Sequence, residues 1–210
     1  MPVSINGNTG VITGLAVGGL PDGTVDADSL ASNAVTAGKL ASGVGGKILA
    51  VSEAIKKDTF STQSTSFTDI TGLSVTMTPA STSSKFLINY TVNFSPRDQH
   101  YSGAIRCVKV VGGTTTDDIY IGDAASNRVR CSSWSFSNNT SQSRASFRPL
   151  TGSFLHSPST TSAVTFKMQC MLLGTYGWAN DVFVNRTNTW SDNNGFGSPV
   201  SSIVVRELAS

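Results

Sequence analysis

Apolar and polar residues alternate in the central part of the chain. In "KFLINYTVNF" the large apolar residues fall on one face of an extended segment: Phe86, Ile88, Tyr90, Val92 and Phe94. Asn89, Thr91 and Asn93 fall on the other face. Because successive side chains of a strand point to opposite faces, this pattern predicts a strand with one face in a hydrophobic core.

The same two-residue period recurs in "LSVTMT", "VTFKMQCML" and "SSIVVREL". The predicted inward residues are Leu73, Val75 and Met77, then Val164, Phe166, Met168, Cys170 and Leu172, and finally Ile203 and Val205. Weaker strand candidates are "AIRCVKVV", "DIYIGD", "CSSWSFS", "RASFRPL", "GSFLHS" and "DVFVNR". We expect eight or nine strands from these ten segments.

The segments between the predicted strands are rich in turn-forming residues, as in "TPASTSSK", "SNNTSQS" and "HSPSTTSA". None of them has the length or the period of a helix. Short strands at regular spacing predict an all-β protein with an antiparallel β-sandwich, jelly-roll-like, of about 150 residues. A small barrel is the alternative closure.

A different period governs the N-terminal part. "VDADSLASNA" is followed by the related "VTAGKLASGV", so that large apolar residues recur every five positions at Val25, Leu30, Val35 and Leu40. Neither a strand nor a helix buries that spacing. Since no aromatic residue precedes Phe60, we expect an extended arm or stalk that is ordered mainly by contacts with other chains.

Composition narrows the classes of partner. Charged residues make up 13% of the chain and the net charge is +2, so no basic stripe for nucleic acid is expected. No apolar run approaches the ~20 residues of a membrane span. The N-terminus "MPVSINGNTG" lacks a basic and an apolar region, which predicts synthesis in the cytoplasm without secretion.

Catalytic and metal-binding patterns are weak. His100 with Asp98, or His156, could be combined with one of the many serines, but no GxSxG motif occurs. Carboxylates for glycan hydrolysis would come from turn-like segments at Asp117, Asp118, Asp123, Asp181 and Asp192. "SDNNGFGS" lacks the spacing of a calcium loop. We therefore expect a protein that is not an enzyme and has no metal or cofactor.

The three cysteines are widely spaced and match neither a zinc motif nor a disulfide framework. Cys107 and Cys170 lie within apolar strand patterns, so buried free thiols are expected for them. One disulfide bond, with its two cysteines unassigned, is the alternative.

Aromatic residues fall into two groups. Trp134 and Phe136 alternate with serines in a predicted strand and are expected in the core. Tyr176, Trp178, Trp190 and Phe196 lie in segments rich in Gly and Asn. Exposed aromatic rings beside amides are typical of saccharide-binding surfaces, which makes these four residues candidate receptor or glycan contacts. The alternative is that these residues cover the open end of the sandwich or pack against a neighbouring subunit.

Four segments of the chain carry a resemblance to a known family: the doubled decapeptide, the segment from "ILAVSEAIKKDTF" to "KFLINYTV", "IYIGDAASNRVR" and "SPSTTSAVTFKMQ". Together they resemble tail-fibre-like structural proteins of bacteriophages, especially phages of marine cyanobacteria. This resemblance covers nearly the whole chain from about Leu20. It implies a virion component, a homotrimer in which an N-terminal stalk leads to a β-rich head, and no catalytic residues.

On this reading residues 1–24 form an arm that docks on other virion proteins of the tail or capsid. Residues 25–50 form the oligomerising stalk through Val25, Leu30, Val35 and Leu40, and residues 51–210 form the head. The chain reaches its stalk almost at once, unlike a full tail fibre with its long anchoring domain. A capsid decoration protein and a carbohydrate-binding, lectin-like module that meets a host-surface glycan are the alternatives.

Overall fold

The computed structural model describes residues 4–6, 8, 11–13, 30–31, 34–35, 39, 48–97, 102–116, 119–136, 148–173, 181–187 and 197–209. The chain divides into two compact units, Met1–Gly46 and Lys47–Ser210. We call the second unit the head. Each unit is described by itself.

In the first unit, β1 (Ser4–Asn6) and β2 (Val11–Thr13) form an antiparallel pair in which Ile5 lies opposite Ile12. A single turn follows further along, where the backbone N–H of Ala34 donates to the carbonyl oxygen of Ala31 at 2.9 Å. The ammonium group of Lys39 donates to the carbonyl oxygen of Ala34 at 2.8 Å.

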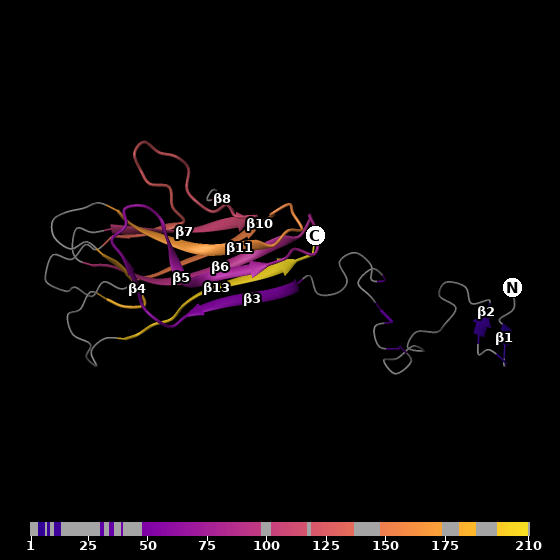
Figure 1. Cartoon of the computed structure of the whole chain (residues 1–210). Helices are drawn as coiled ribbons and strands as arrows, with labels where there is room; N and C mark the ends of the chain where they lie inside the picture. The colour runs from indigo at the N-terminus through magenta and orange to yellow at the C-terminus, as the bar shows by residue number, and fades with distance from the viewer. Residues whose placement is uncertain are drawn as a thin grey trace. The chain divides into compact units, whose positions relative to one another are not determined.

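The head is an antiparallel β-sandwich, and its described residues contain no α-helix (Figure 1). The first sheet holds β3 (Ile48–Lys56), β4 (Phe60–Thr62), β6 (Lys85–Pro96), β10 (Arg148–His156), β12 (Val182–Val184) and β13 (Ser201–Leu208). The second sheet holds β5 (Thr68–Met77), β7 (Ser102–Val111), β8 (Thr114–Thr116), β9 (Ser133–Phe136) and β11 (Val164–Leu173). The predicted fold class is confirmed.

Eight of these strands are nested as in a jelly roll. Going inward from the two ends of the head, β3 pairs with β13, β5 with β11, β6 with β10, and β7 with β9. The pairs β13–β6 and β11–β7 then complete the spatial orders β3-β13-β6-β10 and β5-β11-β7-β9. The chain is thus one long hairpin rolled into two facing sheets, which is the arrangement of a jelly roll.

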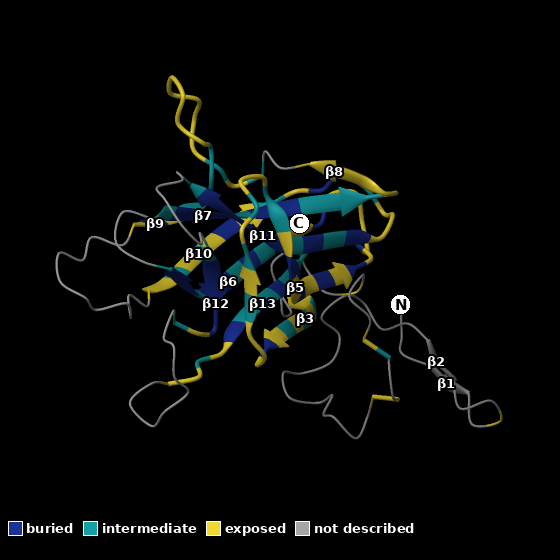
Figure 2. Cartoon of the chain, turned by 60° about the vertical axis from the view of Figure 1, so that its left-hand side comes forward, coloured by how far each residue is buried: buried dark blue, intermediate teal, exposed yellow. Residues whose placement is uncertain are grey.

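The core lies between the sheets and is formed by the residues that the alternation predicted. Phe86, Ile88, Tyr90, Val92 and Phe94 are all buried. The predicted inward residues of β5, β11 and β13 are buried as well. Figure 2 shows the resulting change between buried and exposed positions along the strands. The two-residue period therefore identified the covered face of each of these strands correctly.

Three features of the strand prediction were wrong. β3, β4 and β8 were not predicted as strands. "RASFRPL" and "GSFLHS" are not two strands, because residues 148–156 form the single strand β10. Residues 119–123 of "DIYIGD" form no strand, because they belong to a loop that leaves the sandwich.

A buried polar cluster holds the end of β3 to the rest of the head. The side-chain amide of Asn185 donates to the carbonyl oxygens of Lys56 and Asp58 at 2.8 and 3.0 Å. Its oxygen accepts from the Ser201 hydroxyl at 2.6 Å. Asn185 has φ = 61°, and its short amide side chain tolerates this left-handed conformation. Lys56, with a buried side chain, pairs with Asp58 at 2.9 Å.

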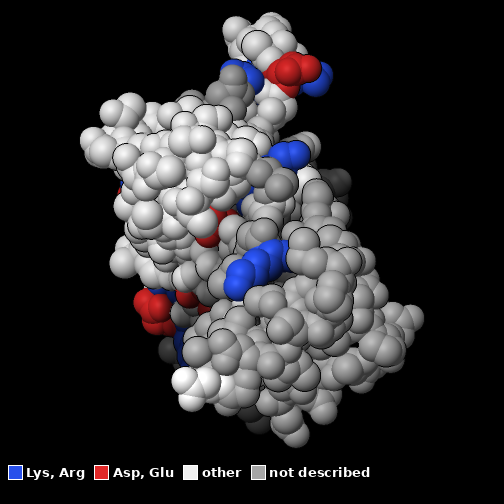
Figure 3. Space-filling view, turned by 90° about the vertical axis from the view of Figure 1, so that its right-hand side faces the viewer, with Lys and Arg blue, Asp and Glu red and all other residues white. Residues whose placement is uncertain are grey.

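Among the described residues on the face drawn in Figure 3, Lys and Arg form separate patches and no continuous stripe. Among the residues that the structure describes, no helix has the length and apolar character to cross a membrane.

Candidate ligand groove

The loop of residues 119–132, between β8 and β9, rises from the sandwich and folds back on itself (Figures 1 and 2). The Arg128 N–H donates to the Ala125 carbonyl oxygen at 3.1 Å and closes the tip, where Ser126 has φ = 49°. The two limbs are joined by Gly122, whose carbonyl oxygen accepts from Arg130 Nε at 2.7 Å. The loop is therefore an ordered projection of the head.

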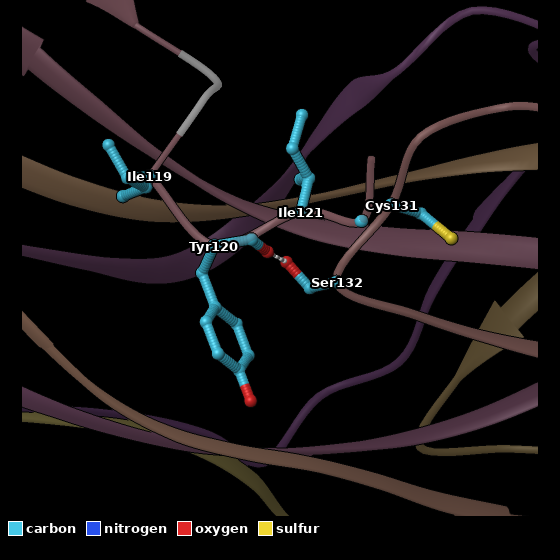
Figure 4. A pocket seen from close by; sticks show the side chains of 6 residues that line it. Ile119, Tyr120, Ile121, Cys131 and Ser132 are labelled. Carbon is cyan, nitrogen blue, oxygen red and sulfur yellow. Dashed lines mark hydrogen bonds between the residues drawn. The ribbon is translucent and has the colours of Figure 1, made fainter. Parts of the chain in front are cut away.

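Ser132 fastens the base of this loop to β7. Its N–H donates to the Ile105 carbonyl oxygen at 2.9 Å, and its hydroxyl oxygen accepts from the Cys107 N–H at 3.1 Å. The same hydroxyl donates to the Tyr120 carbonyl oxygen at 2.5 Å (Figure 4). One serine thus ties both limbs to the sheet.

The first limb is anchored by apolar contacts. The Tyr120 ring stacks on the Phe154 ring of β10, with centroids 4.2 Å apart and planes 4° apart. Ile119 packs against the hydrophobic core. Because these contacts fix one limb, the other limb carries its side chains at a defined position above β7 and β9.

Two hollows share Cys131 in their walls. The first, of about 410 Å³, is lined by Ile119, Tyr120, Ile121, Gly122, Cys131 and Ser132 (Figure 4). The second, of about 530 Å³, is lined by Ser102, Arg128, Val129, Cys131, Trp134 and Leu173. We call the second hollow the Trp134 groove.

The Trp134 groove combines an exposed aromatic ring with a cation. The Trp134 side chain is 60% exposed, and Arg128 and Val129 on the loop are exposed as well. An exposed aromatic ring can stack on a sugar ring, and a guanidinium group can form bidentate hydrogen bonds to carboxylate or sulfate oxygens. The arrangement is suited to binding a ligand with both a flat apolar face and a negative charge.

Neither the Cys131 thiol, which lines both hollows, nor the core thiols of Cys107 and Cys170 are suited to nucleophilic chemistry. Burial raises the pKa of Cys131, and it raises the pKa of Cys107 and Cys170 to about 12. A thiol must ionise to act as a nucleophile, so these groups remain protonated near neutral pH. The prediction that Cys107 and Cys170 are buried is confirmed, and Cys131 is half-buried.

The prediction that Trp134 and Phe136 belong to the core was wrong. In β9 the inward position is taken by Ser135, which is buried, while Trp134 and Phe136 point outward and are exposed. Serine and aromatic residues simply alternate in this segment, so either face could have been the inner one. Only the pairing of β9 with β7 decides between them.

No protein-family model matches the chain, and no curated protein matches it. The solved structures that are similar include the infectious bursal disease virus Gx strain, at 15% identity and a TM-score of 0.36 over 77% of this chain and 38% of that chain. The VP2 subviral particle of the same virus has 13% identity and a TM-score of 0.37 over 77% of this chain and 37% of that chain. At TM-scores this low the likeness does not bear on function.

The four predicted glycan contacts, Tyr176, Trp178, Trp190 and Phe196, lie outside the described residues. Leu173, which lines the Trp134 groove, directly precedes the segment that contains the first two of them. The groove residues themselves were not predicted as a site, because Trp134 was assigned to the core and "ASNRVR" carried no signal beyond its place in the resemblance.

Two of the four predicted stalk residues are among the described residues. Leu30 is 43% exposed and Val35 is 50% exposed, while Val25 and Leu40 lie outside the described residues.

The candidate catalytic residues are not brought together by the described part of the structure. Asp98, His100, Asp117, Asp118 and Asp192 lie outside it. Asp181 forms an ion pair with Arg97, and Asp123 is exposed in the loop of residues 119–132. Among the described residues no three His, Cys, Asp or Glu side chains gather in a group that could hold a metal ion.

Proposed function

We propose that this chain is a non-enzymatic structural component of a virion, a short trimeric fibre or spike of the tail or head. The observation that carries the proposal is an arm with a five-residue apolar repeat joined to a jelly-roll head. Jelly rolls occur in viral capsid domains and in lectins, and the sequence resembles tail-fibre-like proteins of bacteriophages.

Exposure of the repeat in the single chain supports association. Leu30 and Val35 are large apolar residues at successive positions of the repeat, and both are about half exposed. Covering such side chains removes apolar area from water, which stabilises by about 25 cal/mol per Å². Three copies of the arm, brought together around an axis, provide that cover, with Ala31 and other small residues allowing close approach.

The three parts of the chain then have separate roles. Residues 1–24 dock on the particle, the repeat that begins at residue 25 aligns three chains, and the head is presented to the outside. The head either stabilises the particle or contacts a host surface. Its few charges suit a surface in salty water, where ion pairs are screened within ~10 Å or less.

Light scattering tests the proposal directly. We expect the full chain to have three times its 21.9 kDa mass, and a full chain with Leu30→Asp and Val35→Asp to lose mass towards the monomer. A wild-type chain that stays monomeric at every concentration would overturn the trimeric fibre. It would favour a decoration protein that associates only with its partner.

A carbohydrate-binding role is the second candidate, and the Trp134 groove favours it. We expect a glycan array probed with the full chain to give signals for acidic oligosaccharides. Trp134→Ala should weaken this binding about fivefold, since one aromatic stacking contact contributes about 1 kcal/mol and about 1.4 kcal/mol corresponds to tenfold. Phe136→Ala is the matched control, because Phe136 is an exposed ring on the same strand that does not line the groove. Equal binding by both variants would exclude the groove.

A further inference from the structure

The large apolar residues of β3 lie on the outer face of the sheet, whereas a strand that packs on one face normally turns them toward the core. Leu49, Val51 and Ile55 point outward and are 48%, 59% and 48% exposed. Ala50, Ser52 and Ala54 take the inward positions, and the two alanines pack against the core. A half-buried strand normally turns its large apolar residues inward and its small or polar ones outward.

The apolar surface continues across the neighbouring strands. On β13, Val204 lies opposite Glu53 and Arg206 lies opposite Val51. Leu87 of β6 lies opposite Arg206 on one side. On its other side it lies opposite Leu155 of β10, which is 58% exposed. We call this surface the β3 face, formed by Leu49, Val51, Ile55, Val204, Leu87 and Leu155.

Three polar side chains within this surface are hydrogen-bonded to one another. Arg206 donates to the Asn89 side-chain oxygen at 2.7 Å, and the Asn89 amide donates to the Ser153 hydroxyl at 2.7 Å. Covering a polar group is costly only when it loses its hydrogen bonds. These three side chains can therefore be covered without losing their hydrogen bonds, whereas the Glu53 carboxylate on the same outer side needs a polar partner from the covering surface.

The position of β3 in the chain points to a second copy of this chain as the partner. The repeat ends at Val44 and β3 begins at Ile48, so the four connecting steps span at most about 14 Å. Wherever two repeat segments are joined, the tether brings the two β3 strands close together at high effective concentration.

The charges on this surface are also compatible with self-association. Glu53 and Arg206 project from the same outer side of the sheet, on adjoining strands. An identical surface laid against it can therefore set acid against base.

We propose that the β3 face packs against the β3 faces of the other copies of this chain, which meet around the axis that relates the copies, so that the heads contact one another. This inference rests on the proposed function for its tether, and it adds a contact that the repeat does not provide. Buried aliphatic side chains at its centre, with polar residues around them, would match the usual anatomy of a protein interface.

Cysteine cross-linking in the full chain tests the contact. Val51→Cys is introduced together with Cys131→Ser, and Thr115→Cys, on the exposed strand β8, serves as the control in the same background. Under mild oxidation we expect a disulfide-linked dimer from Val51→Cys and none from Thr115→Cys. No more dimer from Val51→Cys than from the control would overturn the contact.

Mass measurements separate the contact from the stalk. We expect Val51→Asp with Ile55→Asp to weaken association of the full chain at least about tenfold, with an unchanged circular dichroism spectrum. If this variant associates like the wild type, the contact is wrong while the trimer stands. If the variant Leu30→Asp with Val35→Asp keeps the wild-type mass and Val51→Cys still cross-links, the stalk is wrong and the contact stands.

The arm of the same chain is the competing occupant of this surface. In the double variant Leu30→Cys with Val51→Cys, cross-links formed only within one chain would show that the repeat folds back on β3. That result would overturn packing between copies.

Discussion

His156 ends β10 with its ring held in the uncharged form. Its ring lies edge-on to Phe166, with centroids 6.0 Å apart, and its Nε2 atom is buried without a hydrogen-bond partner among the described residues. Burial lowers its pKa to about 4, and the positive charge of Lys109 adds to the effect. The native head therefore resists protonation of a group that the unfolded chain protonates near pH 6.5.

This difference predicts an acid-sensitive stability. Below pH 6.5 the unfolded chain binds the proton and the native head does not, so the free energy of unfolding should fall until about pH 4 and then level off. Because the residue is only half-buried, we expect a loss of about 1 kcal/mol. Urea unfolding of the wild type and of His156→Gln measures it. An equal slope in both between pH 6.5 and 4 would assign the effect to other groups.

Gly152 marks a close approach between β10 and β6. A Cβ atom at this position would lie 2.4 Å from Tyr90 Cζ and 2.5 Å from its Cε1 and hydroxyl oxygen. Tyr90 is buried and faces Gly152 directly across the strand pair. The ring of Tyr90 thus occupies the space that any side chain would need.

We expect Gly152→Ala to lower the free energy of unfolding by about 1–3 kcal/mol, as overpacking of a core does. Thr151→Ala, at the exposed neighbouring position, should change it much less. Thermal unfolding followed by circular dichroism compares the two. A Gly152→Ala protein as stable as the control would show that Tyr90 moves aside without cost.

At the scale of elements, β3 belongs to the head although most of its large side chains point outward. It pairs with β13 along residues 48–56 and is held by the Asn185 cluster at its end. A head that begins after this strand would leave one edge of β13 unpaired.

Two N-terminal deletions test this role. A fragment that starts at Lys47 should unfold cooperatively, with the head's own stability. A fragment that starts at Lys57 lacks β3 and should lose about 3 kcal/mol or more, because most of the hydrogen bonds along β13 on that side are lost. Urea titration of both fragments measures the difference. Identical midpoints would mean that β3 is dispensable for folding.

At the scale of the whole molecule, association and stability are linked. If three chains bind one another in the folded state only, mass action stabilises that state as the concentration rises. We expect the unfolding midpoint of the full chain to rise with protein concentration. The variant Leu30→Asp with Val35→Asp should depend on it less, and calorimetry over a hundredfold range of concentration compares the two. A midpoint independent of concentration in the wild type would contradict the trimer.

The sequence by itself determined the fold class and the buried side of most long strands. In β5, β6, β11 and β13 large apolar residues occupy every second position, and only one face of such a strand can be covered. It also predicts an arm before the head, since the apolar period changes from five to two.

Only the tertiary structure decided which strands pair and which way β3 and β9 turn. In both, small residues alternate with large ones, and their inner face is set by partners far away in the sequence, as in the pairing of β3 with β13. The same holds for the Trp134 groove, which joins residues 102, 128, 134 and 173. Alternation is a local property, whereas burial depends on the whole nested hairpin. That is why most of the strands could be predicted but the exposed aromatic and aliphatic surfaces could not.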